Sequence, residues 1–92
     1  MTTYYRAKHI LLEDEDDTDY ILEQLDAGVS FEKLAQEFSS CESASKGGDL
    51  GRFPSGTMVA EFERALYHMK VGEMSSRVKT KYGAHIILKL QD

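Results

Sequence analysis

The hydrophobic positions near the start of the chain predict a β-strand over residues 4–13, where aromatic and aliphatic side chains concentrate. Side chains of a strand alternate between its two faces. One face would carry Tyr5, Ala7, His9 and Leu11, and the other Arg6, Lys8, Ile10 and Leu12. Apolar side chains fall on both faces toward the end of this segment, so we expect a central strand that is covered on both sides.

Two helices are predicted to follow this strand. An acidic run, residues 13–17, precedes the first, and its last carboxylates lie where they can cap the helix and favour the positive end of its dipole. Helical spacing of apolar residues predicts a helix over residues 18–27 that ends at Gly28. Ser30 is a good N-cap for a second helix over residues 31–38.

The rest of the chain is predicted to hold three strands and one helix. Residues 39–56 are rich in Ser and Gly, which predicts mostly loop, interrupted by a short strand over residues 50–53. A third helix fits residues 59–67. Strands over residues 77–80 and 84–90 would form an antiparallel hairpin, because their connection is too short for a crossover. This order predicts an α+β fold, a small, mostly antiparallel four-stranded sheet with surrounding helices.

Length and charge narrow the class of protein. Ninety-two residues predict a single domain, residues 1–92, with the monomer as the default state. No apolar run approaches the roughly 18 residues of a membrane span, and the N-terminus lacks the apolar core of a signal peptide. The net charge of −5 argues against nucleic acid or an anionic membrane as a partner. A single cysteine, Cys41, excludes an internal disulfide and suits a reducing cytoplasm.

Two histidines fall inside predicted strands, not at their ends. His9 shares a face with Leu11, and His85 shares a face with Ile87. If the two strands are neighbours, the imidazoles can meet within hydrogen-bond distance and fix each other's tautomer. The alternative is that each is a structural histidine without a role in chemistry.

The lone cysteine adds two alternatives. With the histidines, Cys41 suggests a Cys/His nucleophilic pair. It also suggests a metal site, although the positions of Cys41, His9 and His85 contain no CxxC or HxxxH spacing.

Two further features concern pockets. The glycines of residues 47–51 do not make a phosphate loop, because no Gly-Lys-Ser/Thr follows; a tight turn into a strand is the better interpretation. Met58 and Phe62 are four residues apart at a helix start, so they can line one surface, either a core or a shallow apolar pocket.

Eight short segments follow one another along nearly the whole chain: Lys-His-Ile-Leu at 8–11, Phe-Glu-Lys-Leu-Ala at 31–35, Phe-Ser-Ser-Cys at 38–41, Gly-Gly-Asp-Leu-Gly-Arg-Phe at 47–53, Gly-Thr-Met-Val at 56–59, Glu-Phe at 61–62, Val-Gly-Glu-Met-Ser at 71–75 and Val-Lys-Thr-Lys-Tyr-Gly-Ala-His-Ile-Ile at 78–87. This ordered set of segments resembles the parvulin family of peptidyl-prolyl cis/trans isomerases. The resemblance implies the parvulin fold, which belongs to the FKBP-like superfold.

The resemblance also implies a site without a metal or a cofactor. The catalytic set would be His9, Cys41, Thr80 and His85, with the histidines on adjacent central strands. Leu50, Met58 and Phe62 would form the pocket for the substrate proline ring. Members of the family carry Cys or Asp at the position of Cys41, which argues against an obligatory nucleophile and against a thiolate ligand. The implied partners are proline-containing peptides and unfolded proteins.

The chain departs from the family at Ala60 and Arg77, where Pro is frequent, and at Ala84, where an aromatic residue is frequent. These changes bear on rate and substrate preference.

We expect a non-covalent reaction in which a backbone N–H near Val59 receives the rotating carbonyl. Phospho-directed parvulins carry basic residues in the loop after the first strand; residues 13–17 are acidic here, so we expect no preference for phosphoserine. A non-catalytic peptide-binding or chaperone module using the same cleft is the alternative.

Overall fold

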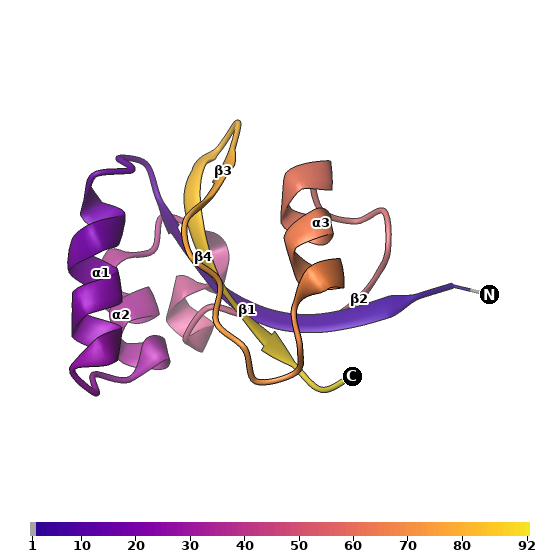
Figure 1. The fold of residues 1–92 in the computed structure, drawn as a ribbon, viewed down its shortest axis with the longest axis horizontal. Coiled ribbons are helices and arrows are strands. Elements are labelled where there is room, and N and C mark those ends of the chain that lie inside the picture. Colours follow the sequence, from indigo (N-terminus) through magenta and orange to yellow (C-terminus); the bar gives the residue numbers. More distant parts are fainter. Residues whose placement is uncertain (1) are drawn as a thin grey trace.

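Four strands form one antiparallel sheet in the order β2-β1-β4-β3 (Figure 1). The computed structural model describes residues 2–92. The strands are β1 (Tyr4–Leu12), β2 (Asp49–Pro54), β3 (Val78–Thr80) and β4 (Gly83–Leu90). All four lie within two residues of the predicted ranges. The long strands β1 and β4 occupy the centre, as expected from the apolar side chains on both faces of β1.

The helices are α1 (Asp17–Asp26), α2 (Phe31–Phe38), the 3₁₀ helix η1 (Glu42–Lys46) and α3 (Ala60–His68). The predicted cap of α2 is confirmed, because the Lys33 N–H donates to Ser30 Oγ at 3.1 Å. None of the helices within residues 2–92 is long and apolar enough to cross a membrane.

One local prediction is wrong, and another lacks a detail. Asp16 occupies the N-cap of α1 but makes no side-chain cap bond. Backbone carbonyls of the preceding turn accept instead, from the Asp17 N–H and the Thr18 N–H. Part of the stretch expected as loop forms η1, because a run of Ser, Ala and Lys can complete a 3₁₀ turn that ends at Gly47, with φ +69°.

The helices divide between the two faces of the sheet (Figure 1). One face, which we call the closed face, packs against α1 and α2. Its buried core consists of Ile10, Leu12, Ile21, Phe31, Leu34, Ala35 and Ile86. The other, which we call the cleft face, packs against α3. Its buried core consists of Tyr5, Ala7, Phe53, Phe62, Leu66, Met69 and Ile87.

The outer edge of β4 pairs with β3 only where β4 begins, up to His85. Beyond that point the irregular segment of residues 72–75 runs beside β4. Three backbone hydrogen bonds join them, from the N–H groups of Gly72, Ser75 and Lys89 to the carbonyl groups of Lys89, Ile87 and Glu73. The backbone groups of β4 that β3 does not reach are therefore paired with a segment that is not itself a strand.

Glycine is required where the loop before β2 meets β1. A Cβ on Gly48 would lie 2.4 Å from the His9 carbonyl oxygen, and the φ of +84° is one that L side chains rarely adopt. The close approach allows the His9 N–H to donate to the Gly48 carbonyl at 2.9 Å. This contact fixes the backbone that carries His9, as the predicted tight turn into a strand requires.

Candidate active site

The two strand histidines meet on the cleft face of the sheet. In the β1–β4 register, Leu11 lies opposite His85 and His9 lies opposite Ile87, so the imidazoles are diagonal neighbours. Their Nδ1 atoms are 3.0 Å apart, and the rings stack with centroids 5.2 Å apart. The predicted meeting of the histidines is confirmed.

Thr80 extends this pair into a chain of hydrogen bonds. Its Oγ1 lies 2.7 Å from His85 Nε2, which confirms that Thr80 joins the polar network. The same oxygen accepts a hydrogen bond from the Tyr82 N–H at 3.2 Å. The β3–β4 hairpin therefore brings Thr80 back onto His85, and the turn of the hairpin holds the hydroxyl in place.

Burial keeps the histidine pair neutral. It lowers the pKa of His9 to about 4, with a further contribution from charge on His85, and it also lowers the pKa of His85. A neutral imidazole has one N–H, and a hydrogen bond between two Nδ1 atoms needs one donor and one acceptor. The histidines must therefore adopt opposite tautomers, one protonated at Nδ1 and the other at Nε2.

Cys41 lies at the same site but is not paired with either histidine. It lines the cavity that both histidines line. Three of the four ring nitrogens are engaged within the His9–His85–Thr80 chain, and the fourth, His9 Nε2, has no hydrogen-bond partner among the described atoms. A nucleophilic thiol needs a base within hydrogen-bond distance, so this geometry does not support the Cys/His pair.

An apolar cavity of about 290 Å³ opens in front of the histidines. The predicted pocket residues Leu50, Met58, Val59 and Phe62 all line it, together with Leu11, Thr57 and Tyr82. The last three were missed. Leu11 shares a strand face with His9, and Tyr82 is two residues from Thr80, so both positions were within reach of the sequence pattern. The volume of the cavity lies near the lower end of the range for ligand pockets, which suits one small ring.

Phe62 joins the cavity to the histidine pair. Its side chain is only 2% exposed, and its ring meets the His9 and His85 rings edge to face at centroid distances of 5.5 and 5.4 Å. Phe62 therefore serves both as the floor of the cavity and as packing for the imidazoles.

This arrangement suits chemistry that needs a dry, shaped pocket and fixed dipoles. No group of three or more His, Cys, Asp or Glu side chains that could hold a metal ion occurs among residues 2–92. The neutral histidines offer oriented dipoles beside an apolar wall, without a charged acid or base at the cavity. Rotation about an amide bond benefits from a dry pocket of this kind, because its transition state loses resonance and is less polar than the planar amide.

A four-stranded antiparallel sheet with paired histidines behind an apolar cavity defines the class of parvulin-type peptidyl-prolyl isomerases. The family model "Rotamase: PPIC-type PPIASE domain" matches residues 9–92. The chain belongs to this family, and it is a peptidyl-prolyl isomerase domain.

Relatives and solved structures agree with this assignment. The chain is 55% identical over 83 residues to the foldase protein PrsA of Geobacillus kaustophilus. This alignment covers 89% of this chain and 30% of that protein. The crystal structure of PrsA from Bacillus anthracis superposes with a TM-score of 0.93 at 44% identity, over 99% of this chain and 43% of that one. The parvulin of Nitrosopumilus maritimus gives 0.84 at 38% identity, over 99% of both chains. The chain thus spans about 30% of the length of the PrsA relative, and nearly all of the Nitrosopumilus maritimus parvulin.

Proposed function

We propose that this domain isomerises X-Pro bonds of peptides and unfolded proteins without a covalent step. The proline ring would occupy the apolar cavity, against Leu50, Met58 and Phe62. The observation that carries the proposal is the juxtaposition of this cavity with a buried, neutral histidine pair. In this mechanism four polar side chains set the geometry and the local electrostatics of the cavity, and none of them transfers a proton: His9, His85, Thr80 and Cys41.

The required acceleration is within reach of such a pocket. Unassisted isomerisation of an X-Pro bond takes tens to hundreds of seconds. Reaching milliseconds requires four to five decades, or about 6 kcal/mol off the barrier. Desolvation of the amide nitrogen and one hydrogen bond to the rotating carbonyl, from a backbone N–H near Val59, are of the right kind, because both favour the twisted amide over the planar one.

Exchange NMR on a short Ala-Pro peptide tests the proposal. An isomerase at substoichiometric concentration accelerates cis/trans exchange, whereas a peptide-binding module only shifts the peaks. A Cys41→Asp variant supplies the matched test of the chemistry. It should retain much of the activity, and complete loss of activity with an intact fold would indicate a nucleophilic thiol instead.

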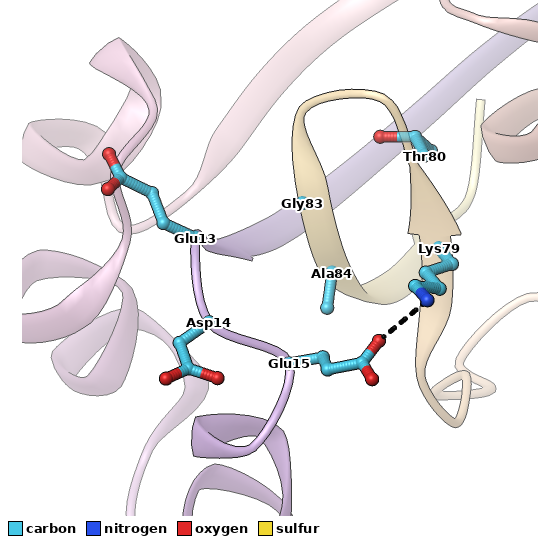
Figure 2. A pocket seen from close by; sticks show the side chains of 7 residues that line it. All are labelled: Glu13, Asp14, Glu15, Lys79, Thr80, Gly83 and Ala84. Carbon is cyan, nitrogen blue, oxygen red and sulfur yellow. Dashed lines mark ion pairs between the residues drawn. The ribbon is translucent and has the colours of Figure 1, made fainter.

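We further propose that the domain does not favour phosphorylated substrates. A groove beside the cleft is lined by Glu13, Asp14 and Glu15, with Lys79 and Thr80 opposite (Figure 2). The cation is already engaged, because Lys79 Nζ lies 3.1 Å from Glu15 Oε2. The groove is next to the active cleft, since Thr80 lines it and hydrogen-bonds His85. A phosphate with about −1.5 to −2 charges would be repelled here.

A peptide pair that differs only in phosphorylation of the residue before proline tests this proposal. The unphosphorylated Ser-Pro peptide should turn over faster, and the difference should shrink at high salt, which screens exposed charges. A Glu13→Gln/Glu15→Gln variant should narrow the gap. Faster turnover of the phosphorylated member by the wild-type protein would overturn the proposal.

Unfolded proteins are the clients we propose, supported by the foldase name of the Geobacillus kaustophilus relative. A monomer, a cytoplasmic location, and no role for nucleic acid or membrane remain predictions from the length, the charge and the single Cys41. Light scattering on the purified protein and fractionation of the source cells would test the state and the location.

A further inference from the structure

One wall of the cavity is formed by a short loop. Residues 55–59 connect β2 to α3, and Thr57, Met58 and Val59 of this loop line the cavity. The loop turns at Gly56, which has a φ of +97°, and most of it is exposed. A wall built from such a loop needs an internal support if it is to present a fixed shape to a substrate.

The carboxylate of Glu63 supplies that support from the first turns of α3. It accepts hydrogen bonds from Ser55 Oγ at 2.9 Å, from the Gly56 N–H at 3.0 and 2.8 Å, and from the Met58 N–H at 3.0 Å. Both carboxylate oxygens are used. Hydrogen bonds of this charge-assisted kind are stronger than neutral ones.

The neighbouring residue on the helix connects this support to the site. Phe62, one position before Glu63, forms the floor of the cavity, while Glu63 holds the loop that carries Met58. One turn of α3 therefore fixes the position of the floor and of the wall relative to each other.

We propose that Glu63 is a positioning residue for the isomerase reaction, which orders residues 55–58 so that Met58 and Val59 present a preformed wall to the proline ring. This inference rests on the proposed use of the cavity for proline. Glu63 does not line the cavity, so it acts through the loop and not on the substrate.

The charge state of Glu63 agrees with this role. Burial alone would raise the pKa of its carboxyl group, but the hydrogen bonds from Ser55 and from backbone N–H groups of the loop outweigh burial and lower the pKa. The carboxylate form, which can accept at both oxygens, is therefore the form favoured in the folded protein. A Gln side chain of similar shape accepts at only one oxygen and presents an NH₂ group to the remaining donors.

The test compares Glu63→Gln with Glu61→Gln. Glu61 lies in the same first turn of α3 and is exposed, so its substitution removes the same charge near the helix dipole without touching the loop. Exchange NMR over a series of Ala-Pro peptide concentrations should show kcat/KM reduced roughly 3- to 10-fold in E63Q, mainly through KM. E61Q should stay within about two-fold of the wild type.

A double-mutant cycle with Ser55→Ala separates positioning from general stability. In the E63Q background, S55A should cause no further loss of kcat/KM, because the bond it removes is already disrupted. In E63Q the Gly56 and Met58 amide protons should also shift in the NMR spectrum and exchange faster, while those of the central strands do not.

Three results would overturn the inference. One is an E63Q kcat/KM within two-fold of the wild type. Another is equal loss in E63Q and E61Q, and a third is full additivity of S55A with E63Q. If the wild type binds the peptide without accelerating exchange, the proposed function fails. The inference is then decided by the peptide Kd, which should be weaker in E63Q than in E61Q.

Discussion

The two faces of the sheet use the same two central strands for different purposes. On the closed face, β1 and β4 contribute Ile10, Leu12 and Ile86 to a core that is apolar throughout. On the cleft face, the alternating positions of the same strands place His9 and His85 beside buried apolar residues, and a cavity remains open in front of them. The closed-face residues of these strands thus contribute to the core alone, whereas the cleft-face residues contribute both to a core and to the site.

The difference lies in how each face is covered. Two helices, α1 and α2, cover the closed face, whereas the single helix α3 and the loop before it cover the cleft face (Figure 1). A thinner cover leaves room for a ligand. It also leaves one buried polar atom, His9 Nε2, without a hydrogen-bond partner among the described atoms, which is a cost to stability that a core alone would not need.

The largest effect should come from truncation on the closed face. Leu34 is 3% exposed in α2, so Leu34→Ala should reduce the free energy of unfolding by about 2–5 kcal/mol through lost transfer energy and a cavity. Urea denaturation measures this loss. Because Leu34 is across the sheet from the site, kcat/KM per folded molecule should not change. A parallel fall in kcat/KM would show that the faces are not independent.

Low pH should reduce the free energy of unfolding by protonating His9, which is buried on the cleft face. The pKa of His9 is about 4 in the folded protein against 6.5 for an unperturbed histidine, so the unfolded chain binds more protons between these values. The free energy of unfolding therefore keeps the full contribution of neutral, buried His9 above pH 6.5, and this contribution is lost as the pH falls toward 4. His9 should contribute a loss of about 2 kcal/mol between pH 7 and pH 5, seen in urea titrations.

Variants of single histidines assign this pH dependence. His68→Gln changes an exposed histidine at the end of α3 and should keep the wild-type slope. His9→Gln should remove most of it. An unchanged slope in H9Q would show that the acid sensitivity does not arise from the buried pair.

A smaller effect, confined to activity, should follow truncation at the rim of the cleft. Met58 is half-buried and lines the cavity, so Met58→Ala should lower kcat/KM about 10-fold, roughly 1.4 kcal/mol, with little change in unfolding. Phe62→Ala is less informative, because Phe62 is also core. Val71→Ala, at an exposed apolar residue outside the cavity, is the control. Kinetics of M58A equal to those of V71A would contradict the pocket assignment.

Periodicity and capping predict most of the fold, because those signals are local. The α2 helix begins after Ser30 and ends at Phe38 as predicted, since the cap and the apolar spacing lie within the same short segment. The meeting of His9 and His85 needed more. Strand alternation placed each on a face, but only adjacency of β1 and β4, implied by the resemblance, brought the faces together.

Features that depend on the path of a loop were not predictable in the same way. The bonds from Glu63 to Gly56 and Met58 require a particular loop shape that no residue pattern states. Likewise η1 is a single 3₁₀ segment in a Ser-rich stretch, where weak propensities leave several conformations open. The lining of the cavity by Thr57 depends on the same loop path.

The irregular segment of residues 72–75 has a consequence for a protein that handles extended polypeptides. An open sheet edge would invite a client chain, or a second copy of the domain, to add as a new strand and polymerise. Here the far half of the outer edge of β4 is occupied by residues 72–75, whose three backbone hydrogen bonds to β4 use the groups that an added strand would need. This part of β4 is therefore closed to strand addition, and the proposed peptide contacts beside it are those of the cavity, from which a polypeptide can dissociate after its proline has isomerised.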